Sequence, residues 1–249
     1  MGKNALIVTG RNSSKKNGSL DDVINALKSK NIKYTVYDGV EENPSVETVM
    51  EAREIGVKAG CDFIIGIGGG SPMDAAKAIG VMIYHKNENK DFLYKSVSNS
   101  QSLPVIEVPT TCGTGSEVTT VAVLTVHNEK TKKSMSHRIF PRMALVDEKY
   151  IKNAPLKVIC DTAIDALAHI VESCINNNAT EYSKMFAKEG LEAWSKFKDV
   201  LLGNREATDE DFHNMMYAST LAGMCIAHAG TSLPHGLSYP ITYELGIPH

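Results

Sequence analysis

The sequence predicts an α/β domain with a parallel sheet, followed by an all-helical domain. Two observations carry this prediction. Up to about residue 150, short β-rich runs alternate with amphipathic helical stretches, which is the order of a parallel sheet covered by helices. Beyond that point the β signal fades and only helical periodicity remains. We therefore expect one domain over residues 1–150 and a second over residues 151–249.

The elements follow from these patterns in chain order. In the first part we expect strands at Ala5–Thr9, Ile32–Tyr37, Asp62–Ile67, Pro104–Val108 and Ala144–Val146, and helices at Leu20–Lys30, Val46–Ala59 and Pro72–Tyr84. Ser19 is a candidate N-cap of the first helix. Residues Val118–Val126 and Lys132–His137 indicate a β excursion. In the second part we expect helices at Leu156–Ile175, Glu181–Lys198 and Asp209–Ala227.

Composition narrows the classes of function. The 249 residues are 43% hydrophobic, and 26 basic against 29 acidic side chains give a formal net charge of −3, so no nucleic-acid-binding surface is expected. No apolar run approaches the ~18 residues of a membrane span. Five cysteines without a CxxC pair fit a reducing compartment. The start of the chain leads directly into a strand, so we expect no signal peptide and a cytoplasmic location.

A glycine-rich turn follows the third expected strand, where residues 66–74 read Gly-Ile-Gly-Gly-Gly-Ser-Pro-Met-Asp. Ser71 can N-cap the next helix, with Pro72 at its first position and Asp74 completing a capping box. Consecutive glycines leave backbone N–H groups uncovered, and at a helix N-terminus such groups suit a phosphate. The turn departs from the Rossmann fingerprint, because Ser71 stands where the third glycine belongs and three strands precede it. A tight strand-to-helix turn is the alternative.

Two further segments lie where parallel sheets bind ligands. Residues 109–119, Pro-Thr-Thr-Cys-Gly-Thr-Gly-Ser-Glu-Val-Thr, follow the fourth strand and are rich in hydroxyl groups. An ordinary solvated loop is the alternative. Asp38 ends the second strand, where an acid can accept hydrogen bonds from ribose hydroxyls and repel a 2′-phosphate. An Asp-Gly turn explains the same residues equally well.

The helical part contains a candidate metal constellation. Asp165 and His169 are four residues apart on an expected helix, so they project from one face and suit two ligands of one metal. His235 and His249 follow later, each directly after a proline. One aspartate and three histidines suit Fe²⁺ or Zn²⁺. A helix-surface hydrogen bond is the commoner meaning of a single Asp-x-x-x-His pair.

Four motifs in order along the chain together resemble the iron-dependent (group III) alcohol dehydrogenase family. They are Gly68-Gly69-Gly70-Ser71-x-x-Asp74-x-Ala76-Lys77, Pro109-Thr110-Thr111-x-Gly113-Thr114-Gly115-Ser116-Glu117, Asp165-Ala166-Leu167-x-His169, and His235 with His249 after thirteen intervening residues. The match runs nearly end to end. The resemblance implies a dehydroquinate synthase-like architecture, with a nucleotide-binding α/β domain, a helical metal-binding domain and an active site in the cleft between them.

The resemblance also implies roles for individual residues, with NAD(H) and Fe²⁺ as cofactors and Zn²⁺ as the alternative metal. It implies that Gly68, Gly69, Gly70 and Ser71 hold the pyrophosphate, with Asp74 in the same cofactor-binding set, and that Thr110, Thr111, Thr114 and Ser116 line the nicotinamide side. Lys133 matches a family lysine near the cofactor ribose, Asp38 matches the acid associated with a preference for NAD over NADP, and Asp165, His169, His235 and His249 match the metal ligands.

The implied activity is hydride transfer between NAD(H) and a small primary or secondary alcohol or aldehyde, in a chain that resembles homodimeric enzymes. Glycerol dehydrogenase and dehydroquinate synthase share the architecture. The complete metal set and the Thr110-Thr111-x-x-Thr114 pattern favour the alcohol dehydrogenase branch. This argument rests partly on analogy of fold.

The sequence departs from the family pattern at three points. Tyr239 stands where members often carry a proton-relaying histidine, and a tyrosine titrates near ~10, so it is a poorer base. His228 stands where several members have asparagine, which makes Tyr239 and His228 the candidates for a proton relay. Family members normally extend beyond His249 and before Ala5, so we expect a chain trimmed at both ends. The rival hypothesis is a nucleotide-binding fragment without catalytic activity.

Overall fold

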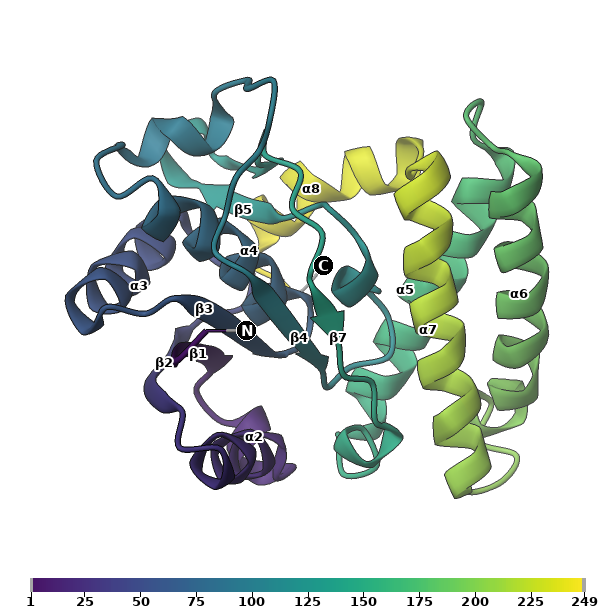
Figure 1. Ribbon diagram of the computed structural model, residues 1–249. Helices are drawn as coiled ribbons and strands as arrows, with labels where there is room; N and C mark the ends of the chain where they lie inside the picture. The colour runs from purple at the N-terminus through teal and green to yellow at the C-terminus, as the bar shows by residue number, and fades with distance from the viewer. Residues whose placement is uncertain (1, 248–249) are drawn as a thin grey trace.

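The computed structural model describes residues 2–247 and contains a five-stranded, entirely parallel sheet in the order β2-β1-β3-β4-β7. The strands are β1 (Asn4–Gly10), β2 (Lys33–Val40), β3 (Phe63–Gly68), β4 (Val105–Pro109) and β7 (Met143–Ala144). Each expected strand is present, with bounds that differ by a few residues. The alternation of strands and helices therefore predicted the sheet correctly (Figure 1).

Helices cover both faces of this sheet. Helix α2 (Ser19–Ser29) packs on one face with the hydrophobic cluster that contains Ile7 and Ile65, and α3 (Val46–Ala59) and α4 (Gly70–Tyr84) pack on the other with Leu6 and Ile64. Successive strand residues thus enter opposite cores, as the two-residue period of a strand requires. A short helix, α1 (Ser13–Lys16), follows β1. Ser19 is the first residue of α2 and Gly18 holds the cap position, so the expected Ser19 cap is wrong.

A hairpin and several 3-10 helices lie outside the five-stranded sheet. The β excursion is an antiparallel hairpin of β5 (Val123–Val126) and β6 (Thr131–Ser134). Residues Ser116–Val118, of which we expected only Val118 to be extended, form the 3-10 helix η2. Other 3-10 helices occur at η1 (Lys90–Tyr94), η3 (His127–Glu129) and η4 (Glu148–Tyr150).

The second part is helical, as expected. It consists of α5 (Leu156–Ile175), α6 (Glu181–Leu201), α7 (Asp209–Ala229) and α8 (Leu233–Leu245). Thr180 and Thr208 begin α6 and α7 with capping boxes. Sequence reasoning missed α8, because Pro240 lies inside it and proline in a helical pattern indicates a break.

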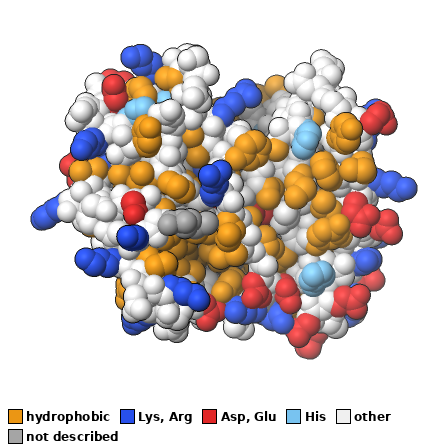
Figure 2. Space-filling model, viewed as in Figure 1, with side chains coloured by type: hydrophobic (Ala, Val, Ile, Leu, Met, Phe, Trp, Pro, Cys, Tyr) orange, Lys and Arg blue, Asp and Glu red, His pale blue; other side chains and the backbone are white. Residues whose placement is uncertain are grey.

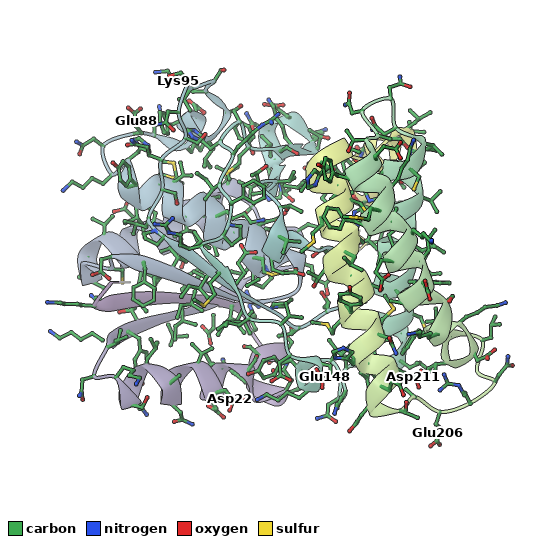
Figure 3. The ribbon with its side chains drawn as sticks, turned by 45° about the vertical axis from the view of Figure 1, so that its right-hand side comes forward. Asp22, Glu88, Lys95, Glu148, Glu206 and Asp211 are labelled. Carbon is green, nitrogen blue, oxygen red and sulfur yellow. The ribbon has the colours of Figure 1, made fainter. Side chains whose placement is uncertain are left out.

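Several contacts join the two parts. Thr220 of α7 donates a hydrogen bond across the boundary to Glu117 of η2 over 2.9 Å. At the end of the first part, Tyr150 of η4 donates to Asp22 of α2 over 3.0 Å, near the place where Asp22 and Glu148 are labelled in Figure 3. Gly115 and Gly223 of α7 approach so closely that a Cβ on Gly115 would lie 2.4 Å from the Gly223 backbone. Helix α8 leaves the other helices and returns to contact β6 (Figure 1).

The surface is mixed in character. Figure 2 shows hydrophobic side chains gathered over the helical part as well as single charged groups around the rim. Exposed large apolar residues there include Ile175 and Tyr182. Within residues 2–247, none of the helices has the length and apolar character needed to cross a bilayer.

Candidate functional site

The glycine-rich turn forms the N-terminus of α4, at the carboxyl edge of the sheet. Gly68 has a φ of 149°, and a Cβ there would lie 2.6 Å from Pro72, so only glycine fits. The helix begins at Gly70 with Gly69 at the cap position and no side-chain cap. The predicted Ser71 cap is therefore wrong, and Ser71 Oγ accepts the backbone N–H of Asn43 at 3.1 Å. An uncapped helix start presents N–H groups that lack intrahelical partners, which suits a phosphate.

The hydroxyl-rich loop 109–119 lies directly against this turn. A Cβ on Gly69 would lie 3.1 Å from the Thr111 side chain, and one on Gly70 would lie 2.8 Å from Thr114. The Thr110 N–H donates to the Gly68 carbonyl over 2.8 Å. The two segments that the sequence singled out separately therefore form one surface, because β3 and β4 are neighbours in the sheet.

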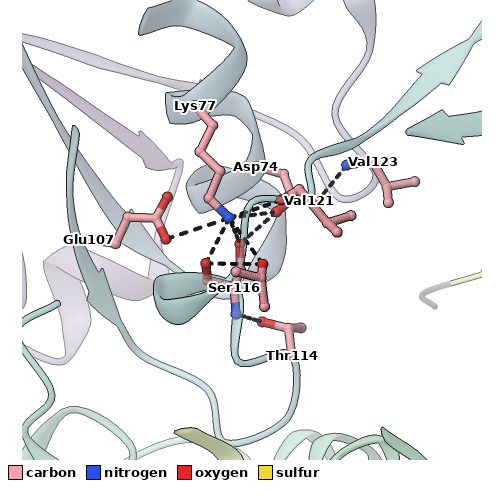
Figure 4. Close-up of polar contacts among 8 residues, drawn as sticks. Asp74, Lys77, Glu107, Thr114, Ser116, Val121 and Val123 are labelled. Carbon is pink, nitrogen blue, oxygen red and sulfur yellow. Dashed lines mark hydrogen bonds and ion pairs between the residues drawn. The ribbon is translucent and has the colours of Figure 1, made fainter. Parts of the chain in front are cut away.

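A buried lysine fixes the loop to α4 (Figure 4). Lys77 is fully buried, and its Nζ donates to Ser116 O and Oγ, both at 2.7 Å, and to Val121 O at 2.9 Å. Ser116 Oγ donates to Asp74 Oδ1 over 2.6 Å, and the Val123 N–H donates to Asp74 Oδ2 over 2.8 Å. Asp74 neither caps α4 nor faces outward. Asp74 and Ser116, which we expected to contact the cofactor, thus hydrogen-bond to each other and help to hold the loop on α4.

Glu107 of β4 lies behind this lysine. Its carboxylate Oε2 is 3.9 Å from Lys77 Nζ, and neither of its oxygens has a hydrogen-bond partner within residues 2–247. Complete burial raises the pKa of Glu107 well above its usual value, against the pull of Lys77, and nearby Asp74 and Glu117 add to the rise. This environment favours the protonated acid. Sequence reasoning missed Glu107, although a single acid inside an otherwise apolar strand was a usable signal.

Three of the four predicted metal ligands converge in the second part. Asp165 and His169 lie on α5 and His235 lies on α8, with one donor atom from each within 4.8 Å of the others. His169 Nε2 is 3.7 Å and His235 Nε2 is 3.4 Å from Asp165 Oδ1, and the two rings stack at 4.5 Å. His249, the fourth predicted ligand, lies outside the described residues. We refer to Asp165, His169 and His235 as the donor cluster.

Hydrogen bonds on the far ring nitrogens orient both imidazoles. His235 Nδ1 donates to Glu172 Oε1 over 2.6 Å, while Ser232 donates its backbone N–H and hydroxyl to Glu172 Oε2 at 2.6 and 2.9 Å. His169 Nδ1 donates to Gly113 O over 3.3 Å. Such bonds set the tautomer that directs Nε2 toward a metal. Sequence reasoning missed Glu172, although its place three residues after His169 on the same helix face was a usable signal.

The pKa values of the two imidazoles shift in opposite directions. Burial lowers the pKa of His169, which favours the neutral imidazole that binds metals. Burial acts on His235 in the same direction, but its bonds to Asp165 and Glu172 outweigh that effect and raise its pKa.

Of the two neighbouring lysines, Lys132 points into the protein and Lys133 points outward. Lys133 is half exposed, pairs with Glu129 at 3.2 Å and lies over the Tyr94 ring. Lys132 is nearly buried, and its Nζ donates to Asn43 Oδ1 over 2.8 Å. Neighbouring residues of a strand point to opposite faces, so only one of the two lysines can face inward. Burial lowers the pKa of Lys132 to about 8, against the attraction of Asp74 and Asp165.

Of the remaining predicted residues, Tyr239 lies near the donor cluster, and His228 and Asp38 lie elsewhere. Tyr239 lies on α8, one turn beyond His235, with Lys132 Nζ 5.6 Å from its ring centre, and burial raises its pKa. His228 is exposed on α7, where its Nδ1 bonds to Met224 O at 2.8 Å and its ring lies beside Phe186. The relay role considered for His228 is therefore not supported by its position. Asp38 ends up at the carboxyl end of β2 in an ion pair with Lys15.

Comparison with known proteins agrees with this architecture. The model of iron-containing alcohol dehydrogenases matches residues 1–148, and the model of the C-terminal part of the Fe-containing alcohol dehydrogenase family matches residues 159–249. An iron-containing alcohol dehydrogenase of Thermotoga maritima has a TM-score of 0.93 and 43% identity, over 100% of this chain and 68% of that one. A sulfoacetaldehyde reductase of Bifidobacterium kashiwanohense, solved with NAD⁺, has a TM-score of 0.86 and 29% identity over 99% of this chain and 65% of that one.

Curated relatives match over nearly the whole chain. A long-chain primary alcohol dehydrogenase of Thermoanaerobacter ethanolicus is 32% identical over 96% of this chain and 60% of its own length. An NADPH-dependent butanol dehydrogenase of Clostridium saccharobutylicum is 32% identical over 100% of this chain and 64% of its own length. The chain thus spans less than two thirds of these relatives. With both family models matched, the chain belongs to the iron-containing alcohol dehydrogenase family.

Proposed function

We propose that this chain carries the coenzyme and metal sites of a dehydrogenase that transfers a hydride between NAD(H) and a small primary or secondary alcohol or aldehyde. One observation carries the proposal. The donor cluster is tied by the His169–Gly113 hydrogen bond to the loop 109–119, which itself lies on the glycine-rich turn. A metal on the cluster and a dinucleotide on the turn would therefore both lie against the same loop.

The donor set fits a divalent transition metal. A carboxylate and two imidazoles whose Nε2 atoms point at one place suit Fe²⁺ or Zn²⁺, and the family favours iron. We propose Asp165, His169 and His235 as ligands, with His249 as the fourth. Glu172 holds the His235 ring in register through their 2.6 Å hydrogen bond.

The dinucleotide would use the uncapped start of α4. The N–H groups of Gly70 and Ser71 would hold the pyrophosphate, and Thr110, Thr111 and Thr114 would line the nicotinamide side. We propose Lys132, in place of Lys133, as the lysine near the ribose, because it is the one that points into this region. Relatives include both an NADPH-dependent enzyme and a structure with NAD⁺ bound, so the coenzyme is a nicotinamide dinucleotide in either case.

The division of chemical work follows from these positions. When bound, the metal supplies Lewis-acid polarisation of the substrate oxygen, and the nicotinamide supplies the hydride donor or acceptor. The chain itself binds and orients: Lys77 holds the loop, and Glu172 and Gly113 fix the two imidazoles. Tyr239, whose pKa is raised by burial, keeps its proton at neutral pH and can donate a hydrogen bond but is a poor base.

We also propose a cytoplasmic location and a homodimeric state. The five cysteines are all unpaired, which fits the reducing cytoplasm. The homodimer rests on the family resemblance alone.

The first experiment is NADH oxidation with a panel of small aldehydes, using protein purified without oxygen and loaded with Fe²⁺. Turnover that is lost on chelation and restored by metal supports the proposal. Intact NADH binding and stoichiometric metal without turnover would instead support the nucleotide-binding fragment, and would direct attention to the third of the relatives that this chain does not match.

A further inference from the structure

The end of strand β2 lies close to the proposed phosphate site. Asn43, just beyond β2, donates its backbone N–H to Ser71 Oγ in the glycine-rich turn at 3.1 Å. In the sheet, β1 lies between β2 and β3. The carboxyl ends of β2 and β3 are therefore about 10 Å apart, which is two strand spacings. A dinucleotide whose phosphates lie at α4 thus brings its adenosine ribose to the end of β2, where Asp38 is found.

Two cations from the turn after β1 approach Asp38. Lys15 of α1 forms an ion pair with Asp38 Oδ2, with about half of each side chain exposed. Arg11, which begins the same turn, also contributes to lowering the pKa of Asp38, although the Lys15 hydrogen bond is the main cause. The two cations and one carboxylate leave a formal excess of one positive charge, where an isolated aspartate would leave one negative charge.

This balance matters for the choice of coenzyme. An acid at the end of the second strand accepts hydrogen bonds from the ribose 2′-hydroxyl and repels a 2′-phosphate, whereas a nearby cation accommodates the phosphate. Lys15 is exposed and flexible enough to turn from Asp38 to a phosphate, and as a point charge it needs no fixed geometry to do so.

We infer that Lys15, supported by Arg11, offsets Asp38 so that this chain accepts dinucleotides with and without a 2′-phosphate, and that Lys15 sets the ratio between them. The inference rests on the proposed dinucleotide site and deepens it. Lys15 is a specificity-determining residue, and the reacting end of the coenzyme lies too far away for it to touch.

The test is equilibrium binding of 5′-AMP and 2′,5′-ADP by calorimetry, which needs neither metal nor turnover. The wild-type chain should bind both nucleotides. Lys15→Ala should weaken 2′,5′-ADP by about tenfold, since a charge-assisted contact is lost, and change 5′-AMP by less than twofold. Lys16→Ala, which removes an exposed lysine from the same short helix, is the matched control and should change neither.

Asp38→Asn provides a second, opposite arm, because it should raise the affinity for 2′,5′-ADP and lower that for 5′-AMP. The inference is overturned if Lys15→Ala affects both nucleotides equally or neither, or if the wild type binds 5′-AMP and not 2′,5′-ADP. In those cases the proposed dinucleotide site stands. If neither 5′-AMP nor NADH binds, the site itself is contradicted and the inference fails with it.

Discussion

The network around Lys77 and the donor cluster are both buried groups of ionisable side chains, but only the first contains a lysine as its cation. Around Lys77, a lysine ammonium lies among Asp74, Glu107 and three backbone or hydroxyl acceptors, so the chain supplies its own cation. In the donor cluster a carboxylate and two imidazole nitrogens point at one place from two helices.

This contrast distinguishes a structural ion pair network, around Lys77, from a binding site, at the donor cluster. Buried charges are tolerated when they are paired and hydrogen-bonded, and Lys77 and Asp74 meet that condition with protein atoms. Glu107 does not, which is why burial favours its protonated form. The outer nitrogens of the donor cluster are held by Glu172 and Gly113, while its inner atoms face one another across a few ångströms. We expect substitutions in the first region to affect stability and those in the second to affect metal binding.

The largest effect should come from removing a ligand. His169→Ala should reduce Fe²⁺ or Zn²⁺ affinity by more than the roughly 100-fold that marks loss of a supporting residue, because one of the converging nitrogens disappears. Metal content after anaerobic loading measures this. His228→Ala removes an exposed histidine from α7 and should retain full metal content. Equal metal content in both variants would contradict the assignment of the cluster.

Next comes the buried lysine. Lys77→Met should lower the free energy of unfolding by about 3–5 kcal/mol, since it leaves buried carboxyl groups without their cation. Urea unfolding of the metal-free chain gives the value. Lys133→Met, an exposed counterpart, should change it by about 0.5 kcal/mol or less. If Lys77→Met unfolds at the same urea concentration as the wild type, the network does not hold the loop.

A smaller effect on metal binding is expected behind the cluster. Glu172→Gln weakens the hydrogen bond that orients His235 and should cost roughly 10–100-fold in metal affinity. Competition with a calibrated chelator measures the change. Glu189→Gln, on the exposed face of α6, serves as the comparison and should leave the affinity unchanged. An unchanged affinity in Glu172→Gln would show that the His235 ring is positioned by packing alone.

The smallest effect should appear as a pH dependence. The pKa of Glu107 is raised in the folded chain, so the wild type loses stability as pH rises above the ordinary value of the unfolded carboxyl. Glu107→Gln removes that titration. From pH 5 to pH 8, the melting temperature of Glu107→Gln should therefore rise relative to that of the wild type. The expected rise is about 2–4 °C for each kcal/mol of unfolding free energy that the wild type loses. A constant difference across that range would mean that Glu107 does not titrate there.

Local patterns were enough to predict much of the molecule. The parallel sheet, three of the four helices of the second part and the positions of both ligand loops followed from periodicity and from turn residues. The Asp165–His169 pair was predicted because four residues make one helical turn, and that spacing survives in any fold. Motif order along the chain identified the family, which the comparisons confirmed.

Only the tertiary structure decided which neighbours these residues have. Asp74 and Ser116 turn inward to Lys77, and Lys132 rather than Lys133 is buried against Asn43 and Tyr239, since the hairpin face that meets α8 is fixed by distant packing. Contacts such as His169–Gly113 join residues 56 positions apart. Sequence periodicity reports which face of an element is buried, whereas the identity of the group across the interface depends on how separate elements pack.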